Sequence, residues 1–264
     1  MSDAVHDVLW TSGWDSTFRV ADLVLTHGRV VRPHYLIDPS RLSTEVELET
    51  IAELRKAIAA KSDDAGSLLM PLAIHHGSDF RLDADTAASL RRLRTITHLG
   101  PQNDLLIPLA QSLAPRELEH CSDRGEGTHR FSAFLGTDAA RDPAPPPDDV
   151  YRIVDRPSKP DLAVYGYFRF PVLRISKVEM GEEANLRGFG DIMEMTWFCR
   201  RPTRRRGPCG ICGPCSDARE EGLGRRVPEV GRPLRLARSF DQKARRVARK
   251  ARRTLIPRRA ATPR

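Results

Sequence analysis

Four of the five cysteines of this 264-residue chain lie in one short segment near its C-terminal end. They follow the spacing Cys199-x9-Cys209-x2-Cys212-x2-Cys215, and intervening glycines allow the turns that bring the last three sulfurs to one point. Four thiolates satisfy a tetrahedral Zn²⁺ at about 2.3 Å each, and a complete cysteine set leaves no open position for chemistry. The segment therefore predicts a structural zinc site, which can contribute on the order of 10 kcal/mol to local folding.

An iron–sulfur cluster is the alternative for these cysteines, because Cys-x2-Cys-x2-Cys also opens a ferredoxin motif. That motif continues with x3-Cys-Pro, whereas Ser216-Asp217-Ala218-Arg219 follows here and no later cysteine exists. The spacing therefore favours zinc. The remaining cysteine, Cys121, is expected to be a small buried residue.

Charge is unevenly distributed along the chain. Residues 231–264 carry thirteen Lys and Arg against the single Asp241, and subtracting this +12 from the total of +8 leaves −4 for residues 1–230. The high pI therefore belongs to a basic tail and not to the body. The sequence shows neither a leader pattern nor an apolar run of the ~18–20 residues that a membrane span needs, so we expect a cytoplasmic protein in which clustered cysteines bind metal.

Strand and helix patterns alternate through the body. Apolar, β-branched runs predict strands over residues 5–10, 30–37, 68–75, 118–121 and 168–175. Helical spacing of apolar residues predicts helices over residues 18–25, 43–58, 83–96 and 105–113, with another beginning at residue 176. This alternation predicts an α/β fold with a doubly wound, mainly parallel sheet.

Three regions follow from these patterns. Residues 1–195 are expected to form the α/β domain, residues 196–230 a small four-cysteine zinc-binding element, and residues 231–264 the basic tail. Within the first region, glycines and prolines predict a flexible insertion near residues 122–150, either a substrate lid or a disordered loop.

Residues 10–17 read Trp-Thr-Ser-Gly-Trp-Asp-Ser-Thr and connect the first strand to the first helix. A loop of small hydroxyl residues and glycine at a helix N-terminus offers N–H groups, hydroxyls and about half a positive charge to a phosphate. Ser16 and Thr17 can donate to phosphate oxygens, and Asp15 could cap the helix or help hold a metal ion. The alternative is an ordinary helix cap, because capping uses the same amino acids.

This loop resembles the Ser-Gly-Gly-x-Asp-Ser signature of the PP-loop ATP pyrophosphatases, with Thr11, Ser12 and Gly13 in the place of Ser-Gly-Gly. A Walker P-loop is not indicated, because no Gly-Lys-Ser/Thr is present.

Further segments resemble one branch of that superfamily, 7-cyano-7-deazaguanine synthase. The resemblance rests on Thr196-Trp197-Phe198-Cys199, Cys209-Gly210-Ile211-Cys212-Gly213-Pro214-Cys215 with Arg219, Ser176-Lys177, and Pro101-Gln102-Asn103. The chain departs from the family pattern at Asp38-Pro39-Ser40, where Tyr-Gly-Gln is expected. It also departs at Pro101-Gln102-Asn103, which lacks the arginine of the family's Pro-Gly-Arg-Asn. Residues 122–160 show no match to the family's substrate-facing segment.

The resemblance implies an adenine nucleotide α-hydrolase-like fold and an ATP-dependent carbon–nitrogen ligase. Such an enzyme adenylates 7-carboxy-7-deazaguanine and uses ammonia to form 7-cyano-7-deazaguanine on the queuosine and 7-deazapurine pathway. Carried over to this chain, the resemblance assigns ATP, together with Mg²⁺, to Thr11, Ser12, Gly13, Trp14, Asp15, Ser16 and Asn103. It makes Asp15, Ser16 and Lys177 the catalytic candidates and leaves the four cysteines with a structural zinc.

Two other functions remain open from the sequence. A related PP-loop enzyme could modify another acceptor, such as a tRNA base or a protein terminus. A non-catalytic nucleotide- or nucleic-acid-binding protein is the alternative from a different class, since the basic tail could bind nucleic acid or an anionic surface. A solvated tail is the simpler interpretation, and a homodimer is a further candidate assembly.

Overall fold

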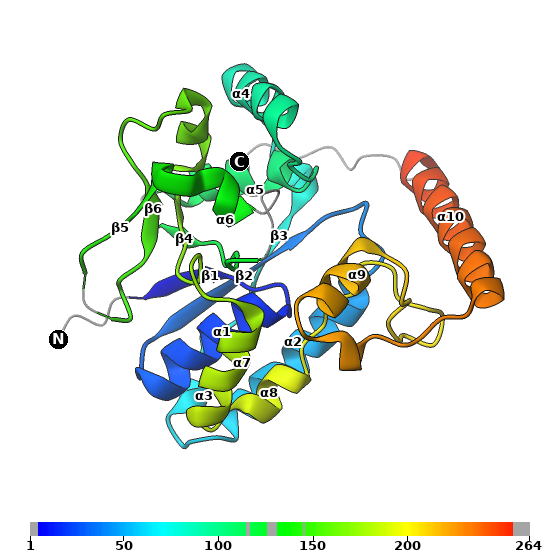
Figure 1. Ribbon diagram of the computed structural model, residues 1–264, viewed down its shortest axis with the longest axis horizontal. Coiled ribbons are helices and arrows are strands. Elements are labelled where there is room, and N and C mark those ends of the chain that lie inside the picture. Colours follow the sequence, from blue (N-terminus) through cyan, green and yellow to red (C-terminus); the bar gives the residue numbers. More distant parts are fainter. Residues whose placement is uncertain (1–4, 115–116, 126–130, 145, 256–264) are drawn as a thin grey trace.

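The computed structural model describes residues 5–114, 117–125, 131–144 and 146–255, and a five-stranded sheet lies at its centre (Figure 1). The strands run in the order β3-β2-β1-β4-β7, and every neighbouring pair is parallel. Their bounds are β1 His6–Leu9, β2 Val31–Ile37, β3 Ala73–His76, β4 Leu118–Glu119 and β7 Phe168–Arg169. The predicted α/β fold with a parallel sheet is confirmed.

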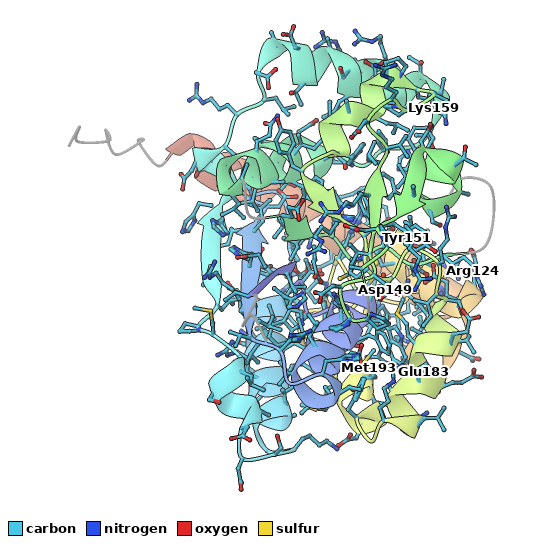
Figure 2. All side chains as sticks on the ribbon, turned by 90° about the vertical axis from the view of Figure 1, so that its left-hand side faces the viewer. Arg124, Asp149, Tyr151, Lys159, Glu183 and Met193 are labelled. Carbon is cyan, nitrogen blue, oxygen red and sulfur yellow. The ribbon has the colours of Figure 1, made fainter. Side chains whose placement is uncertain are left out.

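Alternating side chains of the strands supply two separate cores. In β1, Val8 packs into one core and Leu9 into the other, as the two-residue period of a strand requires. The core with Val8 is covered by α1 Trp14–Ala21 and its continuation Asp22–Thr26, α2 Thr44–Ala59, α3 Ala65–Leu68, α7 Lys177–Leu186 and α8 Gly190–Glu194. The core with Leu9 is covered by α4 Ala84–Ile96, α5 Asn103–Leu113, α6 Phe131–Leu135 and the 3-10 segment Pro160–Tyr165. Figure 2 shows this layering, with Lys159 on one side of the molecule and Glu183 and Met193 on the other.

Prolines shorten two strands that the apolar pattern predicted to be longer. The strand expected from residue 68 begins at Ala73, because residues up to 68 close the short helix α3 and Pro71 has no N–H for the ladder. The strand expected to reach residue 175 ends at Arg169 for the same reason, since Pro171 follows. The strand expected over residues 118–121 is also shorter and ends at Glu119.

Residues 122–150 are not a loop throughout, as the glycines and prolines had suggested. They contain α6, a 3-10 turn Gly136–Asp138 and β5 Ala139–Arg141, which pairs antiparallel with β6 Tyr151–Ile153. Buried Arg19 donates to the carbonyl of Pro147 at 2.9 Å and forms two hydrogen bonds to the buried carboxylate of Glu119. This contact ties the segment to the centre of the sheet.

The C-terminal part of the chain lies beside the carboxyl ends of the strands. It contains α9 Gly213–Glu220, the 3-10 turn Gly224–Arg226 and α10 Arg232–Leu255, which extends at the edge of the molecule (Figure 1). Arg238 on α10 donates to the carbonyl of Cys209 at 2.7 Å, and Asp241 accepts from Arg204. Among the described helices, none is both long and apolar enough to cross a lipid bilayer.

Candidate active site and metal centre

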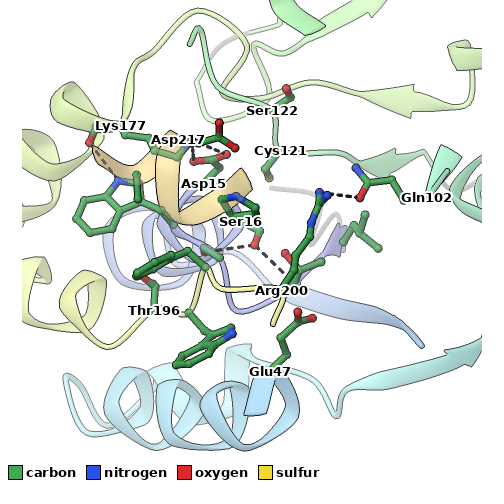
Figure 3. A pocket seen from close by; sticks show the side chains of 18 of the residues that line it. Asp15, Ser16, Glu47, Gln102, Cys121, Ser122, Lys177, Thr196, Arg200 and Asp217 are labelled. Atoms are coloured by element: carbon green, nitrogen blue, oxygen red, sulfur yellow. Dashed lines mark hydrogen bonds and ion pairs between the residues drawn. The ribbon is translucent and has the colours of Figure 1, made fainter. Parts of the chain in front are cut away.

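A cavity of about 340 Å³ opens at the carboxyl ends of β1, β2 and β4 (Figure 3). It lies where the strand order reverses: β2 and β3 are on one side of β1, whereas β4 and β7 are on the other side. Ligands of open α/β sheets bind at such a switch point, where loops diverge to either side. Its wall combines the loop after β1, the residues after β2 and β4, the start of α7, and the C-terminal element.

The loop after β1 ends in a helix N-terminus that no side chain caps. Gly13 is the N-cap residue of α1 and makes no side-chain cap hydrogen bond, so the first N–H groups of the helix stay available to a ligand. Ser12 is buried and adopts φ +58°, the left-handed conformation that glycine takes most readily. Ser12 therefore adopts a backbone conformation that a glycine at this position would also allow.

Lys177 meets three carboxylates inside this cavity. Its Nζ lies 3.2 Å from Asp15 Oδ1, 3.1 Å from Asp123 Oδ2 and 3.1 Å from Glu221 Oε2. The four residues come from α1, the segment after β4, the start of α7 and the residue that follows α9. Two of the three catalytic candidates, Asp15 and Lys177, are thus brought together, and Ser16 lines the same cavity.

The carboxylate cluster shifts the acidity of its members. Burial raises the pKa of Asp15 to about 6, and the charges of Asp123 and Glu221 add to this, while Lys177 opposes it. Burial alone would lower the pKa of Lys177, but the three carboxylates raise it above its usual value. The lysine is therefore a fixed cation at neutral pH, surrounded by an excess of negative charge.

The sequence did not identify Asp123 and Glu221. Asp123 follows β4 closely, which is the position where strand-end residues face a switch point, and that spacing was a usable signal. Glu221 follows α9, and no local pattern distinguishes it from a surface glutamate.

Trp14 and Asn103 have structural contacts in this fold. The Trp14 indole is buried, donates to the carbonyl of Lys177 at 3.1 Å and packs under the guanidinium of Arg226, so it joins α1 to α7 while lining the cavity. Asn103 donates to the carbonyl of Gly100 at 2.9 Å and accepts from the Tyr165 hydroxyl at 2.9 Å. Asn103 is not among the described residues that line the cavity.

A basic wall faces the loop after β1 from the side of β2. Arg41 forms an ion pair with Glu47 at 3.0 Å, and Arg200 donates to Gln102 Oε1 at 3.2 Å (Figure 3). Burial lowers the pKa of Arg200, and the positive charge of Arg41 lowers it further. An anion placed between these guanidinium groups would favour the charged form of Arg200 and so offset both its burial and the repulsion from Arg41.

His120 forms part of the opposite wall, and sequence reasoning missed it. Its ring packs edge-on against Phe168 at a centroid distance of 5.5 Å and also contacts Phe131 and Phe170. Burial lowers the pKa of His120 to about 4, so the imidazole is neutral at pH 7. Its Nδ1 has no hydrogen-bond partner among the described groups.

The four cysteines predicted to bind metal converge in one buried cluster. All four sulfur atoms lie within 4.8 Å of one another, and the Cys199–Cys212 and Cys209–Cys215 pairs are each 3.8 Å apart. Four sulfurs arranged tetrahedrally at about 2.3 Å from one zinc ion would be about 3.8 Å apart. A four-iron cluster binds each cysteine at a different iron, which spreads the sulfurs further, so the observed spacing fits a single ion such as zinc.

Hydrogen bonds around the cluster fit a thiolate set. The backbone N–H groups of Arg201 and Cys209 donate to Cys199 Sγ, and that of Ile211 donates to Cys209 Sγ. Arg219 donates to the carbonyls of Cys215, Gly210 and Pro228, and thereby closes the loop around the cluster. Donors of this kind orient metal ligands and stabilise their negative charge.

Residues 196–230, which contain the cysteine cluster, also build the cavity. Those that line it are Thr196, Trp197, Phe198, Arg200, Pro214, Asp217, Ala218, Glu221, Leu223 and Arg226. The N–H of Trp197 donates to the carbonyl of Ser12 at 2.8 Å, which links the loop after β1 to the segment that enters the cluster at Cys199.

Comparison with known proteins adds no relative to this description. No family model matches the sequence, and no curated protein sequence matches it significantly. Function is therefore inferred from the fold, the cavity and the cysteine cluster themselves.

Proposed function

We propose that the cavity binds ATP and that the chain is a PP-loop enzyme that adenylates a carboxylate. One observation carries this proposal: an uncapped N-terminus of α1, preceded by the small residues Thr11, Ser12 and Gly13, opens into a switch-point cavity that contains a buried lysine. Phosphates bind helix N-termini of this kind through backbone N–H groups and the helix dipole. The strand order and the two helical layers agree with an adenine nucleotide α-hydrolase-like fold.

The charged residues of the cavity suit pyrophosphate release. Attack of a carboxylate on the α-phosphate places new negative charge on the departing pyrophosphate, and fixed cations aimed at that charge lower the barrier. Lys177 would supply one such cation, and Asp15 would hold the Mg²⁺ that accompanies ATP, whose charge would offset the excess of carboxylates around the lysine. Ser16 lines the cavity one residue further along α1 and can donate its hydroxyl to a phosphate oxygen.

The acceptor that the resemblance implies is 7-carboxy-7-deazaguanine, with ammonia as the nucleophile that follows. In support, Leu105, Leu106 and His120 line part of the cavity and offer apolar and neutral polar surface to a planar heterocycle. A related reaction on another acceptor remains the second candidate, because the basic wall beside Arg200 suits a more anionic substrate.

The cysteine cluster is proposed to hold one structural zinc ion. With four cysteine ligands the ion has no open coordination position, so its contribution is to fix α9 and the residues around it against the cavity. Metal analysis of the purified protein should give about one zinc per chain and no colour. A brown protein that contains iron would overturn this assignment.

Pyrophosphate release tests the proposed activity. We expect release with ATP, Mg²⁺, 7-carboxy-7-deazaguanine and ammonium, and a nitrile product by mass spectrometry. Ser16→Ala should reduce turnover strongly, whereas Ser67→Ala, an exposed serine on α3, should not. Release that requires a different acceptor, such as a tRNA base or a protein terminus, would support the second candidate, and an absence of ATP binding to the wild-type protein would refute both.

A further inference from the structure

A second hollow opens directly from the cavity toward α10. It has a volume of about 330 Å³ and shares Asp38, Arg41, Gln102 and Arg200 with the cavity. Beyond these residues its wall is formed by Ser40, Leu42, Pro101, Arg201 and Lys243. The two hollows together form one passage. The second hollow, outside the cavity, is called the basic groove.

The basic groove carries more positive than negative charge. Among the described residues, Arg41, Arg200, Arg201 and Lys243 line it against the single carboxylate of Asp38. Arg41 is paired with the carboxylate of Glu47, whereas the Arg200 guanidinium donates to the neutral amide of Gln102. A groove of this composition attracts an anion that passes along it.

The helix at the outer end of the groove extends this charge. α10 contains eight arginines, two lysines and one aspartate in 24 residues, and residues 204–206 add three arginines to those that line the groove. Arginine exceeds lysine fourfold, and guanidinium groups are suited to bidentate phosphate contacts. Lys243, which lines the groove, belongs to this helix.

An exposed aromatic ring lies next to the groove cation on α10. Phe240 is 70% exposed and precedes Lys243 by three residues, which places both on one side of the helix. Surfaces that bind single strands combine cations that follow the phosphate backbone with exposed aromatic rings on which bases stack.

We propose that a single strand of nucleic acid lies along α10 and enters the basic groove, so that one nucleotide reaches the cavity. A base-paired duplex is too wide to enter a hollow of this volume, because the major groove, which is only one part of the duplex, is already about 12 Å wide. The acceptor would then be that of the second candidate function, a base or nucleotide within a polynucleotide, in place of free 7-carboxy-7-deazaguanine. The binding step stands on the groove and α10, and only the chemistry at the end of the strand rests on the proposed function.

Binding of a labelled 20-nucleotide RNA, and of DNA with the same sequence, tests the proposal by fluorescence anisotropy over a range of salt. We expect the double variant Arg201→Glu/Lys243→Glu to weaken binding at least tenfold and to lower the salt slope by about 1.4, since each cation on a single strand contributes about 0.7. Phe240→Ala should weaken binding about fivefold or more through lost stacking. The tighter of the two polymers identifies the partner.

Arg91→Glu is the matched control, because Arg91 is exposed on α4. It should bind nucleic acid like the wild type. Wild-type affinity in the groove variant, with its fold verified by circular dichroism, would refute the groove. Binding to phosphatidylserine vesicles that is tighter than to either polymer would also refute the proposal and assign α10 to a membrane surface. Since anisotropy needs no ATP, a protein that binds RNA without pyrophosphate release would contradict only the proposed function.

Discussion

Replacing Asp15 by asparagine should stabilise the ligand-free protein while it abolishes the proposed ATP chemistry. Three carboxylates face one lysine in the cavity, so the cluster holds more negative charge than Lys177 can balance. Asp15→Asn removes one of these charges and keeps the shape of the side chain. Lys177 still faces Asp123 and Glu221 in the variant.

The magnitude follows from the acidity of Asp15. Its pKa is raised from 3.8 to about 6, chiefly by burial, and each pKa unit corresponds to about 1.4 kcal/mol, so the ionised carboxylate costs the folded state about 3 kcal/mol. Because the pKa is higher in the folded state, this cost is full above pH 6 and disappears as the pH falls toward 3.8. The gain from Asp15→Asn should therefore be about 3 kcal/mol at pH 8 and less than about 2 kcal/mol at pH 5.

Urea unfolding at pH 8 and pH 5 measures this difference in the free energy of unfolding. Asp63→Asn is the matched control, since Asp63 is exposed and lies far from the cavity in the turn after α2. It should change neither value by more than about 0.5 kcal/mol. An Asp15→Asn protein that is less stable than the wild type at pH 8, or that gains equally at both pH values, would show that the cluster does not strain the fold.

Three further predictions concern the metal, the buried ion pair and the loop. Cys212→Ser should abolish metal binding and make residues 199–228 sensitive to limited proteolysis, whereas Cys121→Ser, outside the cluster, should leave metal content and cleavage unchanged. Glu119→Gln should destabilise the protein by about 3 kcal/mol at pH 7 in urea unfolding. Burial raises the pKa of Glu119, but Arg19 and His6 outweigh the effect of burial and hold this pKa at about 2. The stability that the ionised Glu119 contributes is therefore present above pH 4.5 and lost as the pH falls through about 2. Ser12→Gly should change thermal stability by less than about 1 kcal/mol, while Ser12→Val should cost more than about 2 kcal/mol, because a β-branched residue is strained at φ +58°.

Local patterns in the sequence predicted much of the sheet and most helices. The apolar runs found β1 and β2 nearly to the residue, and helical spacing found α2, α4 and α5. Such signals depend on neighbours in the chain, so they hold wherever an element is regular. They were wrong where Pro71 and Pro171 removed ladder donors, and where α6 and β5 form in residues 122–150 by packing against the rest of the fold.

The candidate site was predictable only as far as it is local. The loop around Asp15 and the four cysteines are each recognised by their spacing within a short segment. His120 and Glu221 are not recognised in this way. The neutral imidazole of His120 depends on three phenylalanines from other segments, and the role of Glu221 depends on a lysine more than forty residues away. Long-range contacts of this kind have no periodic signature in one sequence.

The hydrogen bond from the Trp197 N–H to the Ser12 carbonyl explains why two motifs nearly two hundred residues apart belong to one site. Ser12 adopts a left-handed backbone conformation that costs an ordinary residue about 1–2 kcal/mol, so the loop needs an outside contact to keep it. Trp197 supplies that contact two residues before Cys199, which is held in the cysteine cluster. The cluster can therefore act on the loop after β1 without touching a ligand: its metal would fix Trp197, Trp197 fixes Ser12, and Ser12 sets the direction of the first N–H groups of α1.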